Sequence, residues 1–170
     1  MAGSPSFRVE VLTENDWHRL RDVRLTALSA DPTAFLSSHA TELAYDEQRW
    51  RREFSRGEWH VIVTGSPSPG PGLGLIGVTR VPGMSPQECF LEYFWIAAGI
   101  RGAGVGSLLL GSVLDRLRDA GVRTVWLWIL DGNDDAMRLY KRFGFQSTAE
   151  RQPLPDDPDR SEEKLRLRLA

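Results

Sequence analysis

A glycine-rich segment lies between a strand-like run and an amphipathic helical pattern, and it reads Arg101-Gly102-Ala103-Gly104-Val105-Gly106. A strand that turns through glycines into a helix presents unpaired backbone N–H groups at the helix N-terminus. These donors, together with the helix dipole, suit a pyrophosphate. Glycine also lacks the Cβ that would keep phosphates away from the backbone. The segment therefore predicts a phosphate-binding loop, to which Arg101 adds a positive charge at the mouth.

Spacing tests three interpretations of this loop. A Walker-type loop requires Lys and then Ser or Thr after its last glycine, whereas Ser107-Leu108 follows Gly106. A dinucleotide-binding fingerprint requires a glycine where Ser107 stands, and its acidic residue is represented only by Asp131, which comes late. A glycine-rich turn that merely joins a strand to a helix remains open on spacing alone.

A second set of candidate residues follows the next apolar strand. Asn133 lies at the end of that strand, and Tyr140 lies seven residues later on a short helical pattern. Seven residues are about two helical turns, so both side chains can face one groove. Asn133 is equally suited to cap the helix, and Tyr140 is equally suited to a core position with one hydroxyl contact. These alternatives stay open at this point.

Together the two segments resemble a known family. Arg101–Gly106 resembles the (Gln/Arg)-x-x-Gly-x-(Gly/Ala) motif of the GNAT superfamily of N-acetyltransferases, and residues 133–145 resemble its Asn-x-x-Ala-x-x-Leu-Tyr-x-x-x-Gly-Phe segment. The order of elements over about Phe7 to Leu169 is also similar, although the motifs occupy only the latter half. The resemblance implies a small, bacterial-type, single N-acetyltransferase domain over residues 1–170 that uses acetyl-coenzyme A as cosubstrate and no metal.

The resemblance also implies which residues hold the cosubstrate. Backbone groups of a bulged, splayed strand would hold the pantetheine arm and the thioester, at Phe94, Trp95 and Ile96. The side chain of Trp95 is expected in the core. Asn133 would contact the pantetheine, and the pyrophosphate would be held by the amides of Gly102, Ala103, Gly104, Val105, Gly106 and Ser107.

For catalysis, the acceptor amine must attack as a free base, although an alkylamine has a pKa of about 10. Glu92 is the candidate general base because alternation would place it on the same strand face as Phe94. A solvated or ion-paired glutamate is the alternative. Some relatives carry a glutamate five residues before the asparagine, where this chain has Trp128. Tyr140 would protonate the departing thiolate, so the acetyl group would pass directly to a primary amine.

The resemblance places the acceptor pocket at about Thr33 to Arg56 and Gln152 to Arg160. The first region contains Phe35, His39, Tyr45 and Trp50, and the second contains Asp156, Asp157 and Asp159. The acidic cluster suits either a cationic amine or a solubilising surface turn. The acceptor is a small molecule or a protein amino group. A coenzyme A-binding sensor without turnover is the alternative function, and a homodimer is compatible with either.

Hydrophobic patterns define the elements that must position these residues. Strands are predicted over Phe7–Val11, Trp59–Val63, Leu73–Val78, about Glu88–Ala97, Val125–Leu130 and Lys164–Leu169. Helices are predicted from Asn15 or Asp16 to Asp31-Pro32, over about Asp46–Arg56, from Val105 to Gly121, and over about Asp134–Arg142 with a stop at Gly144. Loops are predicted over Gly65–Gly72 and Pro153–Pro158. With the resemblance, this order implies an α/β fold with a mixed, mostly antiparallel sheet of about six or seven strands, splayed at the fourth and fifth, and about four helices.

Composition bounds the remaining classes. A net charge of −2 over 170 residues argues against a nucleic-acid partner, since such proteins carry a basic excess or face. One cysteine, Cys89, and three separated histidines give little support to a disulfide or a zinc site. Met1–Pro5 lacks the character of a signal peptide, and no apolar run approaches the length of a membrane span. These features favour a cytoplasmic protein with no membrane association.

Overall fold

The computed structural model describes residues 6–65 and 70–170, which form two compact units. The N-terminal unit comprises the chain up to Gly77 together with Tyr93–Ser112, and the C-terminal unit comprises Val78–Glu92 and Val113–Ala170. Part of the predicted loop, Ser66–Pro69, and the Met1–Pro5 segment lie outside the described residues.

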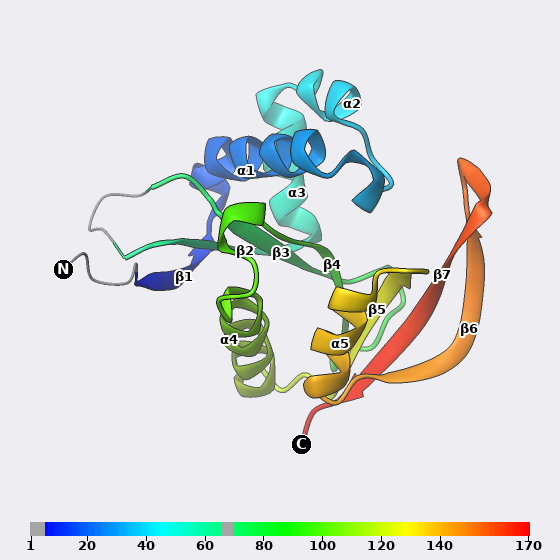
Figure 1. Cartoon of the computed structure of the whole chain (residues 1–170). Coiled ribbons are helices and arrows are strands. Elements are labelled where there is room, and N and C mark those ends of the chain that lie inside the picture. Colours follow the sequence, from blue (N-terminus) through cyan, green and yellow to red (C-terminus); the bar gives the residue numbers. More distant parts are fainter. Residues whose placement is uncertain (1–5, 66–69) are drawn as a thin grey trace. The chain divides into compact units, whose positions relative to one another are not determined.

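Strands and helices are mixed along the chain, with three consecutive helices after the first strand, as Figure 1 shows. The strands are β1 (Phe7–Leu12), β2 (Gly57–Thr64), β3 (Gly74–Thr79), β4 (Glu88–Ile96), β5 (Thr124–Leu130), β6 (Gln146–Leu154) and β7 (Asp157–Arg168). The helices are α1 (Trp17–Ala30), α2 (His39–Leu43), α3 (Glu47–Arg56), α4 (Val105–Asp119) and α5 (Asp134–Arg142).

The hydrogen-bonded strand order is β1-β2-β3-β4-β5-β7-β6, and β4 and β5 form a parallel pair. The pairs β1–β2, β5–β7 and β6–β7 are antiparallel. The register between β4 and β5 runs from Glu88↔Thr124 to Phe90↔Trp126, whereas β4 itself continues to Ile96. This arrangement confirms the expected mixed, mostly antiparallel sheet, and the register of the fourth and fifth strands extends only as far as Phe90.

The core of the N-terminal unit lies between β2 and the helices α1 and α3. Alternate residues of β2, Trp59, Val61 and Val63, are buried on one face because strand side chains alternate between faces. Against them pack Leu20, Val23 and Ala27 of α1 and Trp50 of α3. Fully burying a large apolar side chain stabilises a fold by roughly 1.5–3 kcal/mol. These contacts therefore hold the two helices on the strand.

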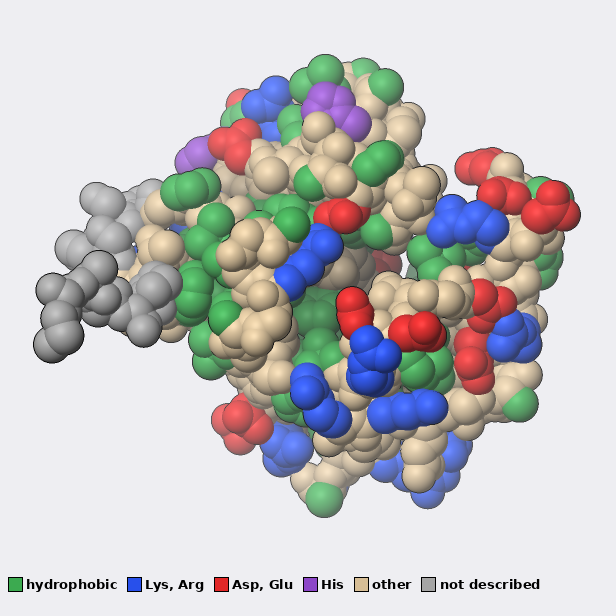
Figure 2. Space-filling model, in the orientation of Figure 1, with side chains coloured by type: hydrophobic (Ala, Val, Ile, Leu, Met, Phe, Trp, Pro, Cys, Tyr) green, Lys and Arg blue, Asp and Glu red, His purple; other side chains and the backbone are tan. Residues whose placement is uncertain are grey.

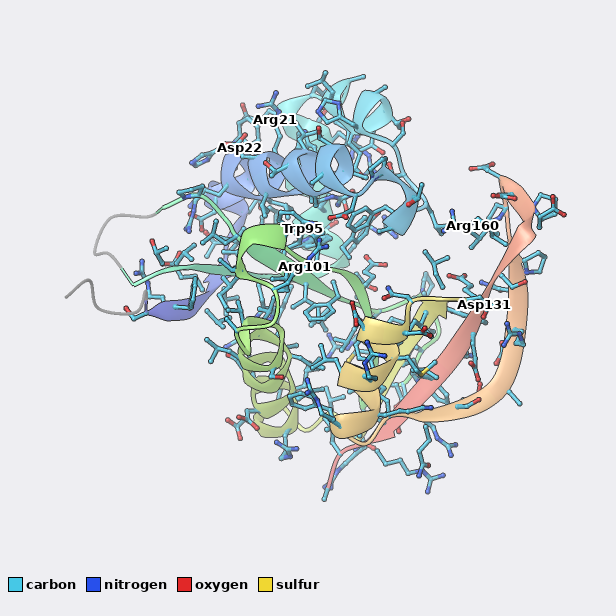
Figure 3. The ribbon with its side chains drawn as sticks, viewed as in Figure 1. Arg21, Asp22, Trp95, Arg101, Asp131 and Arg160 are labelled. Atoms are coloured by element: carbon cyan, nitrogen blue, oxygen red, sulfur yellow. The ribbon has the colours of Figure 1, made fainter. Side chains whose placement is uncertain are left out.

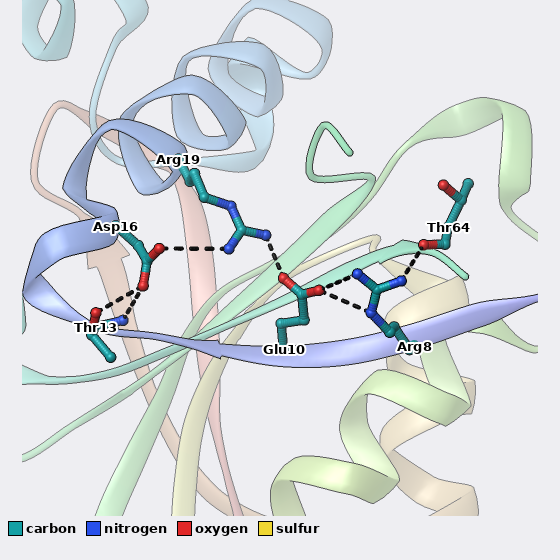
Figure 4. A network of polar contacts seen from close by, with 6 residues as sticks. All are labelled: Arg8, Glu10, Thr13, Asp16, Arg19 and Thr64. Atoms are coloured by element: carbon teal, nitrogen blue, oxygen red, sulfur yellow. Dashed lines mark hydrogen bonds and ion pairs between the residues drawn. The ribbon is translucent and has the colours of Figure 1, made fainter. Parts of the chain in front are cut away.

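A network of charged side chains joins β1 to the start of α1 (Figure 4). Glu10 accepts hydrogen bonds from Arg8 and Arg19, and Arg8 also donates to the carbonyl of Thr64 at 2.9 Å. The pKa of Glu10 is lowered, chiefly by the hydrogen bond from Arg19. The same arginine lies 3.6 Å from Asp16, which caps the turn before α1 through Thr13.

In the C-terminal unit, β5 lies between β4 and β7, and its Val125, Leu127 and Ile129 are buried. The helices α4 and α5 end as predicted. Gly121 and Gly144 both have positive φ, +80° and +93°, and each closes its helix with the paired hydrogen bonds of a Schellman motif.

Three predictions from the sequence were incomplete or wrong. β6 was not predicted, because most of its side chains are polar and exposed and it lies at a sheet edge. The predicted loop over Pro153–Pro158 is wrong: Pro153 belongs to β6, Asp157 begins β7, and Leu154 pairs with Asp157 across a tight turn. The short helix α2 was also missed.

Candidate active site

The strand that precedes the glycine loop, β4, contains one left-handed residue, Tyr93. This residue has a φ of +55°, a left-handed conformation that costs a bulky residue roughly 1–2 kcal/mol. Its ring is held from several sides: it stacks on Phe35 at 6.1 Å, tilts against Trp59 at 5.5 Å, and lies 4.1 Å from the guanidinium of Arg24. Such an irregularity frees main-chain groups from regular pairing. The residues expected to hold the thioester, Phe94–Ile96, follow it directly.

The left-handed conformation of Tyr93 affects the candidate base, Glu92, which comes directly before it. The side chain is half-buried in β4, between the buried Leu91 and the left-handed Tyr93. Alternation of side chains holds only in a regular extended strand. The placement of Glu92 on the same face as Phe94 therefore no longer follows from spacing, because Tyr93 separates them.

The glycine loop leads into α4 with two left-handed glycines. Gly102 and Gly104 have φ of +80° and +78°, and a Cβ built on either would meet no atom within 4 Å. Helix α4 begins at Val105, and the amide of Leu108 donates to the carbonyl of Gly104 at 3.0 Å. The amides of Val105, Gly106 and Ser107 therefore come before Leu108, the first amide that reaches a carbonyl four residues earlier. Open space beside helix-terminal amides is the environment that a pyrophosphate requires.

Arg101 lies near Trp95 (Figure 3), and it is anchored by Asp31, the residue at the end of α1. Its Nη2 donates to Oδ2 of Asp31 at 2.6 Å, and its Nε donates to the carbonyl of Ile96 at 2.7 Å. The indole of Trp95 donates to the same Asp31 oxygen at 2.7 Å, while its ring is buried in the core. Arg101 thus ties the start of the loop to the end of β4 and to Asp31, with which it shares its charge. Sequence reasoning missed Asp31 as a site residue because its partners lie 64 and 70 residues away.

We expect Asp31→Asn to weaken coenzyme A binding several-fold, about the effect of losing one partly exposed charge-assisted hydrogen bond. The pKa of Asp31 is lowered: burial raises it, but the hydrogen bonds from Trp95 and Arg101 and the charge of Arg101 lower it more. A lowered pKa means that this stabilisation is complete above the ordinary value of 3.8 and is lost as the pH falls through the folded-state value.

Thermal unfolding between about pH 5 and pH 3 should therefore show a smaller loss of stability in Asp31→Asn than in the wild type. Asp22→Asn is the matched control, because Asp22 lies on the same helix in an exposed pair with Arg21 at 3.6 Å (Figure 3). Identical acid profiles for all three proteins would contradict the role of Asp31.

In the C-terminal unit, Asn133 caps α5. Its Oδ1 accepts from the amide of Ala136 at 3.3 Å. Its side-chain amide nitrogen makes no hydrogen bond within the described part of the chain. Capping and ligand binding are therefore compatible, because they use different atoms of one exposed side chain.

Tyr140 is buried near the end of the same helix. Its carbonyl accepts from the amide of Phe145 at 3.0 Å, and its ring lies 5.4 Å from that of Phe145. Burial raises the pKa of its phenol well above the ordinary value. The hydroxyl therefore stays protonated across the neutral range, as a proton donor must.

The regions expected to bind the acceptor differ in character. Trp50 is fully buried, so it belongs to the core and not to the wall of a pocket. Phe35 and Tyr45 are partly buried and pack on the same core. The acidic residues Asp156 and Asp159 lie on the exposed tip of the β6–β7 hairpin, where Figure 2 shows a cluster of acidic side chains.

The sequence patterns did not predict a buried cluster of charged side chains. Arg24 of α1, only 3% exposed, pairs with Glu42 of α2 and with Glu53 of α3, the latter at 3.3 Å. Its guanidinium lies over the rings of Trp50, Trp59 and Tyr93 at 4.1–5.3 Å. Burial alone would lower the pKa of Arg24, but Tyr93, Glu42 and Glu53 together raise it. The cluster links α1, α2 and α3 to Tyr93 of β4.

The described residues contain neither a metal-binding cluster nor a membrane-spanning helix. No group of three or more His, Cys, Asp or Glu side chains in residues 6–65 and 70–170 could hold a metal ion. Among the helices that the structure describes, none is long and apolar enough to cross a membrane.

The sequence of the chain is similar to those of known acetyltransferases. A family model described as "Acetyltransferase (GNAT) family" matches residues 20–145. N-alpha-acetyltransferase RimI of Mycobacterium tuberculosis is 33% identical over 87 residues, which are 51% of this chain and 53% of the relative. The [ribosomal protein bS18]-alanine N-acetyltransferase of Haemophilus influenzae is 37% identical over 59 residues, covering 35% and 40%. The chain spans between 20% and 53% of the length of the curated relatives it matches.

Solved structures share the fold over nearly the whole chain. An acetyltransferase of the GNAT family from Streptococcus pneumoniae has a TM-score of 0.77 at 15% identity, covering 97% of this chain and all of the other. A putative acetyltransferase from Salmonella typhimurium, solved with acetyl-coenzyme A, has a TM-score of 0.73 at 16% identity and covers 97% and 95%. At these identities the likeness concerns the fold alone.

Proposed function

We propose that this chain, which belongs to the acetyltransferase (GNAT) family, transfers the acetyl group of acetyl-coenzyme A directly to a primary amine, with residues 1–170 acting as one N-acetyltransferase domain. The observation that carries the proposal is the glycine loop before α4, in which two left-handed glycines leave open space beside the main-chain donors at the start of the helix. The left-handed Tyr93 in β4 comes directly before Phe94–Ile96, the residues assigned to the thioester.

Each residue then has a defined task. The amides of Gly102 to Ser107 hold the pyrophosphate, and the free amide nitrogen of Asn133 binds the pantetheine. Main-chain N–H groups of Phe94–Ile96 stabilise the negative charge that develops on the thioester oxygen. The amine nitrogen forms a bond to the carbonyl carbon as the carbon–sulfur bond breaks. Glu92 or a water held by it accepts the amine proton, and Tyr140 donates a proton to the departing sulfur.

The proposal is tested by calorimetric titration with coenzyme A, followed by a thiol-release assay with acetyl-coenzyme A over a panel of small amines and peptide N-termini. Micromolar binding together with amine-dependent thiol release would support it. The relative from Haemophilus influenzae acts, by its name, on an alanine of a ribosomal protein, and a further relative from Streptomyces lavendulae is a streptothricin acetyltransferase. Both classes of amine therefore belong in the panel.

A coenzyme A sensor without turnover is the second candidate function. Tight binding with no thiol release on any amine, and without slow hydrolysis, would favour it. The presence of both Asn133 and Tyr140 argues for catalysis, because a protein that only binds does not need a proton donor for a thiolate.

We expect Tyr140→Phe to lower kcat by about tenfold to a hundredfold while coenzyme A affinity stays close to that of the wild type. Phenylalanine keeps the ring contact with Phe145 and removes only the hydroxyl proton. Steady-state kinetics and calorimetry measure the two quantities separately. Phe145→Leu is the control for packing, and it should lower stability more than kcat. If Tyr140→Phe lowered binding and turnover equally, the role of Tyr140 would be structural.

A further inference from the structure

A second candidate binding site lies within the C-terminal unit. A pocket of about 360 Å³ opens where β4 and β5 begin and β7 ends. Its lining includes three arginines and a tryptophan: Arg123, Arg166, Arg168 and Trp126, together with Glu88 and Thr124.

Strand register explains why these side chains converge. Glu88 lies opposite Thr124, which lies opposite Arg168, so the three form one row across β4, β5 and β7. The next row on the same face contains Trp126 opposite Arg166. Residues directly opposite in a sheet have Cβ atoms about 5 Å apart. The alternate residues, such as Val125 and Leu167, are buried on the other face, so the two β7 arginines point away from that core.

The positive charges of this pocket outnumber its negative charges. Arg123, Arg166 and Arg168 form no ion pair or side-chain hydrogen bond with any described residue, although Arg166 lies over the ring of Trp126 at 6.0 Å. Other cations of the same hairpin are paired, since Lys164 lies 3.1 Å from Glu150 and Arg151 pairs with Asp131. Glu88 is the one acidic side chain in the lining, and it leaves a surplus of positive charge.

We propose that this pocket binds a small polyanion through phosphoryl or carboxylate groups. The guanidinium groups of Arg166 and Arg168, neighbours on one strand face, present the paired N–H donors that such groups accept. The hydroxyl of Thr124 supplies a further donor, and Arg123 adds charge at the rim. The pocket lies where β5 begins, whereas Asn133 follows the end of that strand, about 20 Å further on. The site is therefore separate from the α5 residues assigned to coenzyme A.

The probes are pyrophosphate and citrate, added at constant ionic strength. The readout is the indole N–H signal of Trp126 in a ¹H–¹⁵N spectrum, assigned with Trp126→Phe. This signal reports on the pocket alone, so the test does not depend on whether the glycine loop also binds pyrophosphate. We expect a saturable shift with a dissociation constant below about 1 mM for at least one probe. A response to pyrophosphate alone identifies a phosphoryl ligand, and a response to citrate alone identifies a carboxylate ligand.

The variant R166Q/R168Q should weaken this binding by about tenfold or more. The matched control is R116Q/R118Q, which removes two charges from α4, outside the pocket, and should bind like the wild type. Arg123→Gln provides a milder variant if the double change unfolds the protein. The proposal would be overturned if neither pyrophosphate nor citrate caused a saturable shift. It would also be overturned if both double variants weakened binding equally.

Discussion

Replacing Gly104 by valine should lower the affinity for coenzyme A by at least about a hundredfold, which corresponds to the loss of about two charge-assisted hydrogen bonds to the pyrophosphate. Gly104 has a φ of +78°, and its missing Cβ faces open space beside the start of α4. A β-branched residue disfavours this conformation, so the loop must either strain or rearrange, and the new side chain fills space that the phosphates need. Calorimetric titration with coenzyme A measures the change.

Gly83→Val is the control for backbone strain. Gly83 has nearly the same φ, +83°, and also has no atom within 4 Å of a built Cβ, but it lies in the turn between β3 and β4. Its valine variant should lose a similar amount of stability and keep its affinity. Equal affinity in the wild type and Gly104→Val would refute the assignment of the loop to pyrophosphate.

Arg24→Met should lower the free energy of unfolding by about 3–5 kcal/mol, because it leaves a buried carboxylate without its partner. Arg24 makes the ion pair of Glu42, a side chain with no exposed surface, and no second cation pairs with Glu42 among the described residues. Glu53, by contrast, keeps Arg49 at 2.8 Å. Urea unfolding followed by tryptophan fluorescence measures the loss.

Two further variants separate charge from packing. Arg24→Met combined with Glu42→Leu removes both charges and should recover most of the stability, since a buried pair can be replaced by apolar groups at little cost. Arg49→Met alone should cost less than about 1 kcal/mol, because Arg49 is partly exposed. If the double variant were no more stable than Arg24→Met, an orphaned carboxylate would not be the cause.

Sequence patterns predicted the elements whose packing is periodic. The four-residue spacing of Val105, Leu109, Val113 and Leu117 is the buried stripe of α4, and all four are buried. The continuously apolar run in β5 corresponds to a strand within the sheet. β6 carried no such signal, because an edge strand with polar side chains on both faces resembles a loop in sequence. The short helix α2 offers too few turns for a period to emerge.

Sequence patterns predicted those features of the candidate site that are local in the chain. Glycines, a helix start and the capping Asn133 are local features that a spacing can reveal. The supports of the site are not local. Asp31 reaches Arg101 across 70 residues, and Arg24 reaches Glu42 and Glu53 across 18 and 29. Nothing in the local pattern around Arg24, which lies between two apolar residues of α1, indicates a charged partner inside the core.

The packing around Tyr93 has a consequence for engineering this protein. The ring of Tyr93, the left-handed residue in β4, packs against Phe35 and against Arg24 of the buried cluster. Phe35 belongs to the region expected to bind the acceptor. A substitution made there to admit a new amine also alters the support of the main chain that follows in β4. Changes in acceptor range should therefore be accompanied by changes in turnover, and libraries that vary Phe35 will need compensating positions around Tyr93 to separate the two traits.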